Sequence, residues 1–213
     1  MQNCVIVSGG IINDYSFYKS FFSSDDYVIC ADGGIKHIAQ IGIVPDLWLG
    51  DFDSCRFSDI IKKHPEFKGA ETITLCPQKD ETDTHYACIE AIKRGYKSIT
   101  IIGGFGGRID HMLSNIHLLE FLEKNNVSGQ IIDEKNTVRI CSDKIVVNKK
   151  RKYLSLIPLD DSVCILRTCG LKYPLNDYLL NREISMGVSN EITDSTAEIY
   201  VKSGKILVVE SDD

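Results

Sequence analysis

The sequence predicts an α/β domain followed by an all-β domain. Over the first 134 residues, short runs rich in β-branched and apolar residues alternate with stretches of helical periodicity. This alternation is typical of a mostly parallel sheet with flanking helices, in a Rossmann-like arrangement. From residue 135 onward only short strand-like runs remain, at spacings of roughly 8–12 residues, which is typical of a β-sandwich. We therefore expect two domains, residues 1–134 and residues 135–213.

In the first domain, a strand is predicted where an apolar run meets glycine or turn residues. The runs are continuously apolar, as expected of strands that are buried on both faces. The predicted strands lie at residues 3–7, 27–30, 47–49, 72–75, 98–102 and 129–132. The predicted helices lie at residues 15–22, 31–40, 57–64, 82–93 and 109–124. Because ligands bind at the carboxyl ends of the strands in an open parallel sheet, we expect a site at that edge.

In the second domain, turn residues such as Ser142-Asp143 and Ser203-Gly204 separate the runs. No long helical period occurs there. The predicted strands lie at residues 137–141, 144–147, 153–157, 162–167, 195–201 and 205–209.

Composition and charge narrow the class of protein. The 213-residue chain is 43% hydrophobic and 25% charged, which is ordinary for a globular protein. Its net charge of −6 argues against non-specific binding of nucleic acid, which needs a basic face. A nucleotide substrate remains compatible, because a bound cation can neutralise phosphates locally. The N-terminus carries no basic segment followed by a long apolar one, so we expect no secretory signal and a cytoplasmic location.

The eight cysteines favour neither a zinc site nor disulfides. No C-x-x-C pair occurs, and several cysteines lie inside apolar strand-like runs. We expect them to be reduced and buried, and to act as small apolar residues of a cytoplasmic protein.

Carboxylates follow the predicted strands of the first domain. In an extended segment residues i and i+2 face the same side, so Asp51 and Asp53 can point at one spot. Two such charges repel each other unless a cation lies between them, and Mg²⁺ prefers carboxylates together with substrate phosphates. Asp83 can supply a third carboxylate. The alternatives are a solvated turn for the first pair, and capping of a helix start for Asp80 and Asp83.

A glycine-rich turn at residues 103–107 precedes the helix predicted at 109–124. Glycine permits close approach of the backbone, amide groups at a helix N-terminus attract phosphate, and Arg108 can clamp phosphate oxygens. The turn is neither a Walker A loop nor a G-x-G-x-x-G fingerprint, and an ordinary tight connection is the alternative. No histidine pair with metal-ligand spacing, G-x-S-x-G elbow or catalytic cysteine is recognisable. These residues indicate magnesium-assisted phosphate chemistry.

Six segments together resemble the bacterial type of thiamine pyrophosphokinase (thiamine diphosphokinase). They run in family order across nearly the whole chain, which makes the combination specific although each segment alone is not. The segments are ADGG at 31–34, PDLWLGDFDS at 45–54, KDETD at 79–83, GGFGGRIDH at 103–111, GLKYPL at 170–175 and SMGVSNE at 185–191.

The resemblance implies a reaction and an assembly. The family transfers a diphosphoryl group from ATP to the hydroxyethyl group of thiamine, giving thiamine diphosphate and AMP, and requires Mg²⁺. Its fold is an α/β catalytic domain followed by a β-sandwich. The resemblance also implies a homodimer, with thiamine bound at the subunit interface between one subunit's catalytic domain and the partner's sandwich.

The resemblance also implies roles for individual residues. It places the magnesium ligands at Asp51, Asp53 and Asp83, and puts Arg108 and Asp110 at the ATP phosphates. Asp83 or Asp110 would accept the proton of the attacking alcohol. The residues implied to border the nucleotide are Asp32, Gly33, Gly34, Lys79, Asp80, Thr82, Gly104 and Gly107. The residues implied for the thiamine pocket are Tyr173, Ser189 and Asn190.

Two positions depart from the pattern of some family members. Tyr173 stands where they carry tryptophan, and its ring keeps a stacking face for a pyrimidine. Lys79 stands where they carry glutamine, and it adds positive charge beside the phosphates. Three other functions stay open at this point: a diphosphokinase acting on a hydroxymethyl heterocycle such as a pterin, a non-catalytic module that binds thiamine or nucleotide, and a metal-dependent phosphatase.

Overall fold

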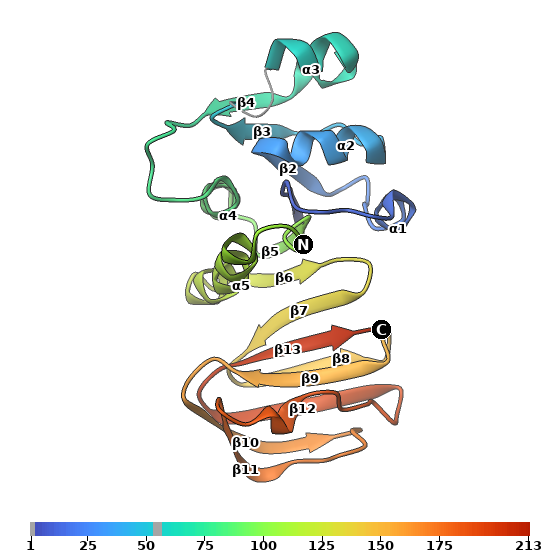
Figure 1. Ribbon diagram of the computed structural model, residues 1–213, viewed down its shortest axis with the longest axis vertical. Helices are drawn as coiled ribbons and strands as arrows, with labels where there is room; N and C mark the ends of the chain where they lie inside the picture. The colour runs from blue at the N-terminus through green and yellow to red at the C-terminus, as the bar shows by residue number, and fades with distance from the viewer. Residues whose placement is uncertain (1–2, 53–56) are drawn as a thin grey trace. The chain divides into compact units, whose positions relative to one another are not determined.

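The computed structural model describes residues 3–52 and 57–213 (Figure 1). The chain divides into two compact units, Met1–Glu134 and Lys135–Asp213. The predicted fold class is confirmed, because the first unit is a parallel sheet with flanking helices and the second consists of antiparallel strands. In the described part of the chain, none of the helices is long and apolar enough to cross a lipid bilayer.

The first unit is built on a parallel sheet with the strand order β4-β3-β2-β1-β5-β6. The strands are β1 (Cys4–Val7), β2 (Tyr27–Ala31), β3 (Leu47–Gly50), β4 (Glu71–Thr74), β5 (Ser98–Ile102) and β6 (Ser128–Ile132). Every residue of β1 and β3 is buried, as the continuous apolar runs predicted. The chain leaves β1 toward β2 and returns on the other side at β5, so the order of the strands reverses between β1 and β5.

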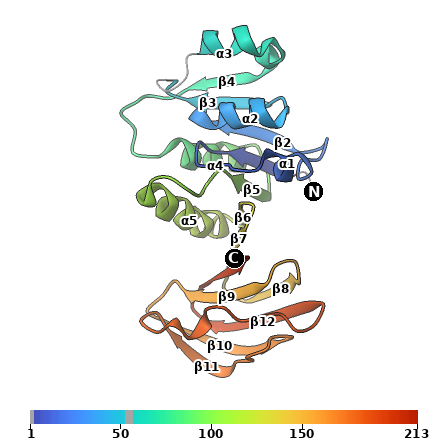
Figure 2. The ribbon, with the colours of Figure 1, turned by 45° about the vertical axis from the view of Figure 1, so that its right-hand side comes forward.

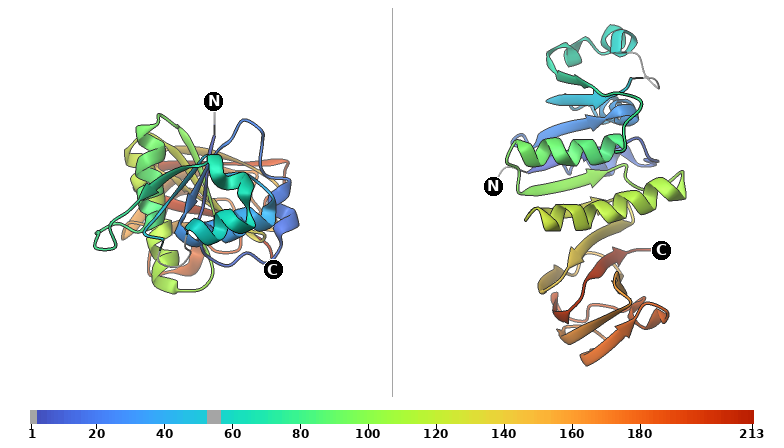
Figure 3. Two further views of the ribbon diagram at one scale, coloured as in Figure 1. Left: turned by 90° about the horizontal axis from the view of Figure 1, so that it is seen from above. Right: turned by 90° about the vertical axis from the view of Figure 1, so that its left-hand side faces the viewer.

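Helices cover both faces of this sheet (Figures 2 and 3). They are α1 (Tyr15–Lys19), α2 (Ile35–Ile41), α3 (Phe57–Lys63), α4 (Asp83–Lys93) and α5 (Ile109–Lys124). In the left view of Figure 3, α4 and α5, in green, lie on one side of the sheet, and the blue to teal helices lie on the other. On that second side Val5, Val7 and Val28 share a core with Ile35 and Ile38 of α2.

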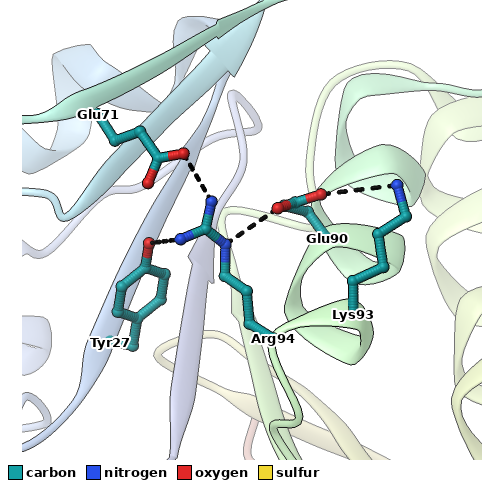
Figure 4. Close-up of polar contacts among 5 residues, drawn as sticks. All are labelled: Tyr27, Glu71, Glu90, Lys93 and Arg94. Carbon is teal, nitrogen blue, oxygen red and sulfur yellow. Dashed lines mark hydrogen bonds and ion pairs between the residues drawn. The ribbon is translucent and has the colours of Figure 1, made fainter.

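Arg94 anchors the C-terminal end of α4 to the amino ends of the strands (Figure 4). Its guanidinium donates to Glu90 Oε1 at 3.0 Å, to the Tyr27 hydroxyl at 2.8 Å and to Glu71 Oε1 at 2.8 Å. Tyr27 begins β2 and Glu71 begins β4. Because α4 runs opposite to the strands, this contact leaves the first turn of α4 at their carboxyl ends.

The second unit consists of two antiparallel sheets that share one core. One sheet has the order β7-β13-β9, and the other β11-β10-β12-β8. Apolar residues from both sheets, such as Leu156, Val208, Ile165 and Ile199, form a single buried cluster. The strands are β7 (Asn136–Cys141), β8 (Lys144–Asn148), β9 (Tyr153–Pro158), β10 (Ser162–Cys169), β11 (Asn176–Asn181), β12 (Thr196–Ser203) and β13 (Ile206–Ser211).

The structure adds elements that the sequence pattern did not predict. The sequence predicted no strand at β11, whose residues NDYLLN include asparagine and aspartate, which have low strand propensity. Short 3-10 helices occur at Asp32–Gly34, Pro65–Gly69 and Ser185–Gly187. The helix expected to begin at residue 31 therefore starts as α2 only at Ile35, after the first of these turns.

The cysteines in the described part of the chain are free thiols. Cys4, Cys30 and Cys88 are buried in the first unit, and burial raises the pKa of each thiol, that of Cys88 to about 12. Cys76 and Cys169 are exposed. The expectation of reduced cysteines agrees with the free thiols, whereas the expectation of burial holds only for part of them.

Candidate active site

A cleft of about 440 Å³ lies at the carboxyl ends of β1, β2 and β5 in the first unit. The first turns of α4 and α5 also border it. This is the edge of the sheet, and the point of strand-order reversal, at which open α/β sheets bind ligands. The cleft is lined by Ser8, Gly9, Gly10, Ile11, Ala31, Asp32, Gly33, Lys79, Thr82, Asp83, Thr84, Gly103, Gly104, Gly106, Gly107, Arg108, His111 and Asn115.

Two glycine-rich loops form one wall of the cleft by direct contact of their backbones. The amide of Gly10 donates to the carbonyl of Gly103 at 2.8 Å. A Cβ on Gly10 would lie 2.3 Å from that oxygen, and a Cβ on Gly103, whose φ is +64°, would lie 2.4 Å from the carbonyl oxygen of Ser8. No side chain fits at either position, so the wall consists of backbone that a ligand can approach closely.

His37 supports this wall from behind. Its Nε2 lies 2.7 Å from the carbonyl oxygen of Gly10, and its Nδ1 lies 2.9 Å from the Tyr15 hydroxyl. A carbonyl only accepts, so Nε2 carries the proton and the tyrosine donates to Nδ1. Burial lowers the pKa of His37, which favours this neutral tautomer.

The first turn of α4 brings a carboxylate into the cleft. Thr82 caps the helix by accepting from the amide of His85 at 3.2 Å, and Asp83 is the first helical residue. Lys79 Nζ lies 2.8 Å from Asp83 Oδ1. That oxygen is inaccessible to solvent and has no partner with hydrogen-bond geometry among the described residues, so the contact with Lys79 is an ion pair. A buried carboxylate oxygen of this kind can accept a cation.

Two buried polar contacts in the cleft were not predicted from the sequence. Ser8 and Thr84, 4% and 9% exposed, share a hydrogen bond of 2.9 Å between their hydroxyl oxygens. The side-chain amide of Asn115 donates to the carbonyl of Gly104 at 2.8 Å. The first contact joins residues that are 76 positions apart, the second joins α5 to the loop that precedes it, and no local motif signals either one.

Arg108 lines the cleft, whereas Asp110 does not. The two side chains form a double ion pair in which Arg108 Nε donates to Asp110 Oδ1 at 3.1 Å and its terminal nitrogen donates to the other oxygen. This hydrogen bonding lowers the pKa of Asp110 and raises that of Arg108. Both side chains are well exposed at the start of α5.

Of the remaining carboxylates expected at the site and described by the structure, only Asp32 is found in the lining of the cleft. Asp32 lines the cleft in a left-handed conformation (φ +40°), and its carbonyl accepts from Trp48 Nε1 at 3.1 Å. Asp51 and Asp80 do not line the cleft, and Asp53 lies outside the described residues. Among the described residues, no group of three His, Cys, Asp or Glu side chains could hold a metal ion. The three-carboxylate magnesium site therefore stays a prediction.

The residues expected to bind thiamine lie together in the second unit. The side chain of Asn190 is 8% exposed and accepts from the amide of Tyr173 at 3.1 Å, while its own amide donates to the Tyr173 carbonyl at 2.8 Å. Ser189 has a left-handed backbone (φ +59°), and its amide donates to Ser155 Oγ. Asn190 thus fixes the Tyr173 segment, and Tyr173 is 61% exposed.

Comparisons with known proteins agree with this arrangement. The family model "Thiamin pyrophosphokinase, catalytic domain" matches residues 18–131, and "Thiamin pyrophosphokinase, vitamin B1 binding domain" matches residues 133–206. The thiamine pyrophosphokinase of Bacillus subtilis is 28% identical over 216 residues, covering 100% of both chains. Its crystal structure superposes with a TM-score of 0.89 at 27% identity, covering 100% of both chains. The Geobacillus thermodenitrificans thiamin pyrophosphokinase gives 0.86 at 27% identity, covering 100% of this chain and 98% of the other. The chain belongs to the thiamin pyrophosphokinase family.

Proposed function

We propose that this chain transfers the diphosphoryl group of ATP to the hydroxyethyl group of thiamine, giving thiamine diphosphate and AMP. The observation that carries this proposal is the match of both family models along the chain, with most of the cleft lining, from Ala31 to Asn115, inside the part matched by the catalytic one. The cleft offers backbone amide groups, Lys79 and Arg108 for phosphates.

Mg²⁺ is part of the proposal. Asp83 fits a cation because its Oδ1 is buried without a hydrogen-bond partner among the described residues. Asp51 follows β3 at the same edge of the sheet, and Asp53 comes two residues later. We assign Mg²⁺ to Asp83 together with Asp51 and Asp53, where the ion would neutralise charge on the phosphate oxygens.

The chain's own residues then position the reactants. Arg108 offsets phosphate charge at the mouth of the cleft, and Asp110 orients its guanidinium. Phosphoryl transfer depends mainly on such positioning and on charge neutralisation. Two carboxylates were considered as proton acceptors, and of these Asp83 lines the cleft. Asp110 is exposed and paired with Arg108, which lowers its pKa. We therefore assign the orientation of the alcohol to Asp83.

We assign thiamine binding to the second unit, around Tyr173, Ser189 and Asn190. The exposed Tyr173 ring offers a face on which a pyrimidine can stack. A homodimer with the active site at the subunit interface, and a cytoplasmic location, complete the proposal. Light scattering of the purified chain tests the dimer.

A product assay tests the reaction. Purified protein is mixed with ATP, Mg²⁺ and thiamine, and AMP and thiamine diphosphate are quantified against a control without thiamine and against Asp83→Asn. We expect equal amounts of both products, and a loss of at least a hundredfold in the variant, because a charge-stabilising group is removed. Free phosphate would indicate a phosphatase, turnover only with a pterin alcohol would indicate the related diphosphokinase, and binding without turnover would indicate a non-catalytic module.

A further inference from the structure

The cleft already contains a cation beside the buried carboxylate oxygen of Asp83. Lys79 Nζ lies 2.8 Å from Asp83 Oδ1, and the two side chains are only 16% and 24% exposed. Both line the cleft. Lys79 precedes α4 and is not part of a helix, so its side chain reaches the carboxylate from the loop that leads into the first turn.

Both strong cations of the described cleft lining are held by carboxylates. Arg108 is paired with Asp110 at the exposed mouth, and Lys79 is paired with Asp83 in the less exposed interior. The ammonium group and a divalent cation repel each other if they share one carboxylate. A metal ion can therefore use Asp83 fully only after Lys79 has found another negative partner.

We propose that Lys79 determines the order of binding in this cleft. Its ammonium group neutralises Asp83 when no ligand is present, and moves to a phosphate group when a nucleotide enters. The move frees Asp83 for a divalent cation, so that the metal binds well only together with a phosphate chain. This inference deepens the proposed function and rests on it, since it takes the cleft to be the nucleotide site.

The chemistry of lysine suits such an exchange. Its ammonium is a point charge on a flexible four-carbon stem with three donors, so it can leave one oxygen for another without reorganising the backbone. The buried Oδ1 has no hydrogen-bond partner among the described residues that would replace the ammonium. Loss of Lys79 without a replacement cation therefore leaves a charge that attracts metal.

Binding of Mn²⁺ alone tests the first half of the proposal. It is measured from the electron paramagnetic resonance signal of the free ion. Nucleotide-free wild type is compared with Lys79→Gln and with Lys93→Gln. Lys93 is a matched control, because it lies at the other end of α4 and pairs with Glu90 at 3.7 Å. We expect Lys79→Gln to bind Mn²⁺ about tenfold more tightly and the control to match wild type. In an Asp83→Asn background, Lys79→Gln should have no effect.

Binding of ATP in excess EDTA, measured by calorimetry, tests the second half. We expect Lys79→Gln to bind metal-free ATP about tenfold more weakly, because a phosphate loses its ammonium partner. If Lys79→Gln leaves the affinity for Mn²⁺ or for metal-free ATP unchanged, the inference is wrong. The proposed function still stands in that case if wild type forms AMP with thiamine. Wild type that binds no ATP at all overturns the proposed function as well. Equal melting temperatures verify that the variant folds.

Discussion

Replacing Thr84 by valine should destabilise the first unit more than replacing Thr84 and Ser8 together. Valine keeps the shape of threonine but removes the hydroxyl, so the Ser8 oxygen, 4% exposed, loses its partner at 2.9 Å. A buried polar group left unpaired costs about 1–3 kcal/mol. Ser8→Ala should cost a similar amount, because it leaves the Thr84 hydroxyl unpaired. The double variant removes both groups and should lie within about 1 kcal/mol of wild type.

Trp48 supplies the assay. It is the chain's one tryptophan, it is 1% exposed, and it lies in β3, so its fluorescence in urea reports unfolding of the first unit. Wild type, both single variants and the double variant form a thermodynamic cycle with a coupling energy of at least about 1 kcal/mol. The reasoning would be refuted if the free energy of unfolding of each single variant lay within about 0.5 kcal/mol of the wild-type value. Strictly additive losses in the double variant would refute it too.

Three further predictions concern the framework of the cleft. Burial lowers the pKa of His37 below its ordinary 6.5. The contribution of the neutral imidazole to stability is therefore full above pH 6.5 and is lost as the pH falls through the lowered pKa. In urea unfolding between pH 7.5 and 5, His37→Gln should lose less stability than wild type. Gly34→Ala should cost about 1–3 kcal/mol or more, because a Cβ would lie 2.0 Å from a carbonyl oxygen of β1, whereas the control Gly69→Ala meets nothing within 4 Å and should be neutral. Arg94→Met should cost about 1 kcal/mol in low salt and less in 1 M salt, since its two glutamate contacts are largely screened there; an effect independent of salt would argue against the ion pairs.

The sequence predicted the strands best where burial alone determines them. Runs made mostly of apolar residues identified β1, β3 and β5, because strands covered on both faces bury nearly all of their side chains. β11 was missed because its residues have weak strand propensity and its position depends on pairing with β10. Local patterns could not supply that tertiary information.

The sequence also predicted the part of the site that lies in local motifs, and missed the part that depends on tertiary contacts. Residues in motifs that follow strands, such as Asp32, Lys79 and Asp83, do line the cleft. The contact between Ser8 and Thr84 could not be found, because 76 residues separate two ordinary hydroxyl side chains that meet only when α4 packs on the sheet. The pairing of Lys79 with Asp83 has helical spacing, yet the sequence does not indicate that the pair lies inside a cleft.

The distribution of the thiols makes the chain suitable for site-selective labelling. Cys4, Cys30 and Cys88 are buried with raised pKa values and should react slowly with maleimides, since the thiolate is the reactive form. Cys76 and Cys169 are exposed, and one lies in each compact unit. With Cys55 and the half-buried Cys164 replaced by serine, a donor and an acceptor dye can be attached at these two native cysteines. Energy transfer between the dyes would then follow the two units during turnover, with no cysteine introduced.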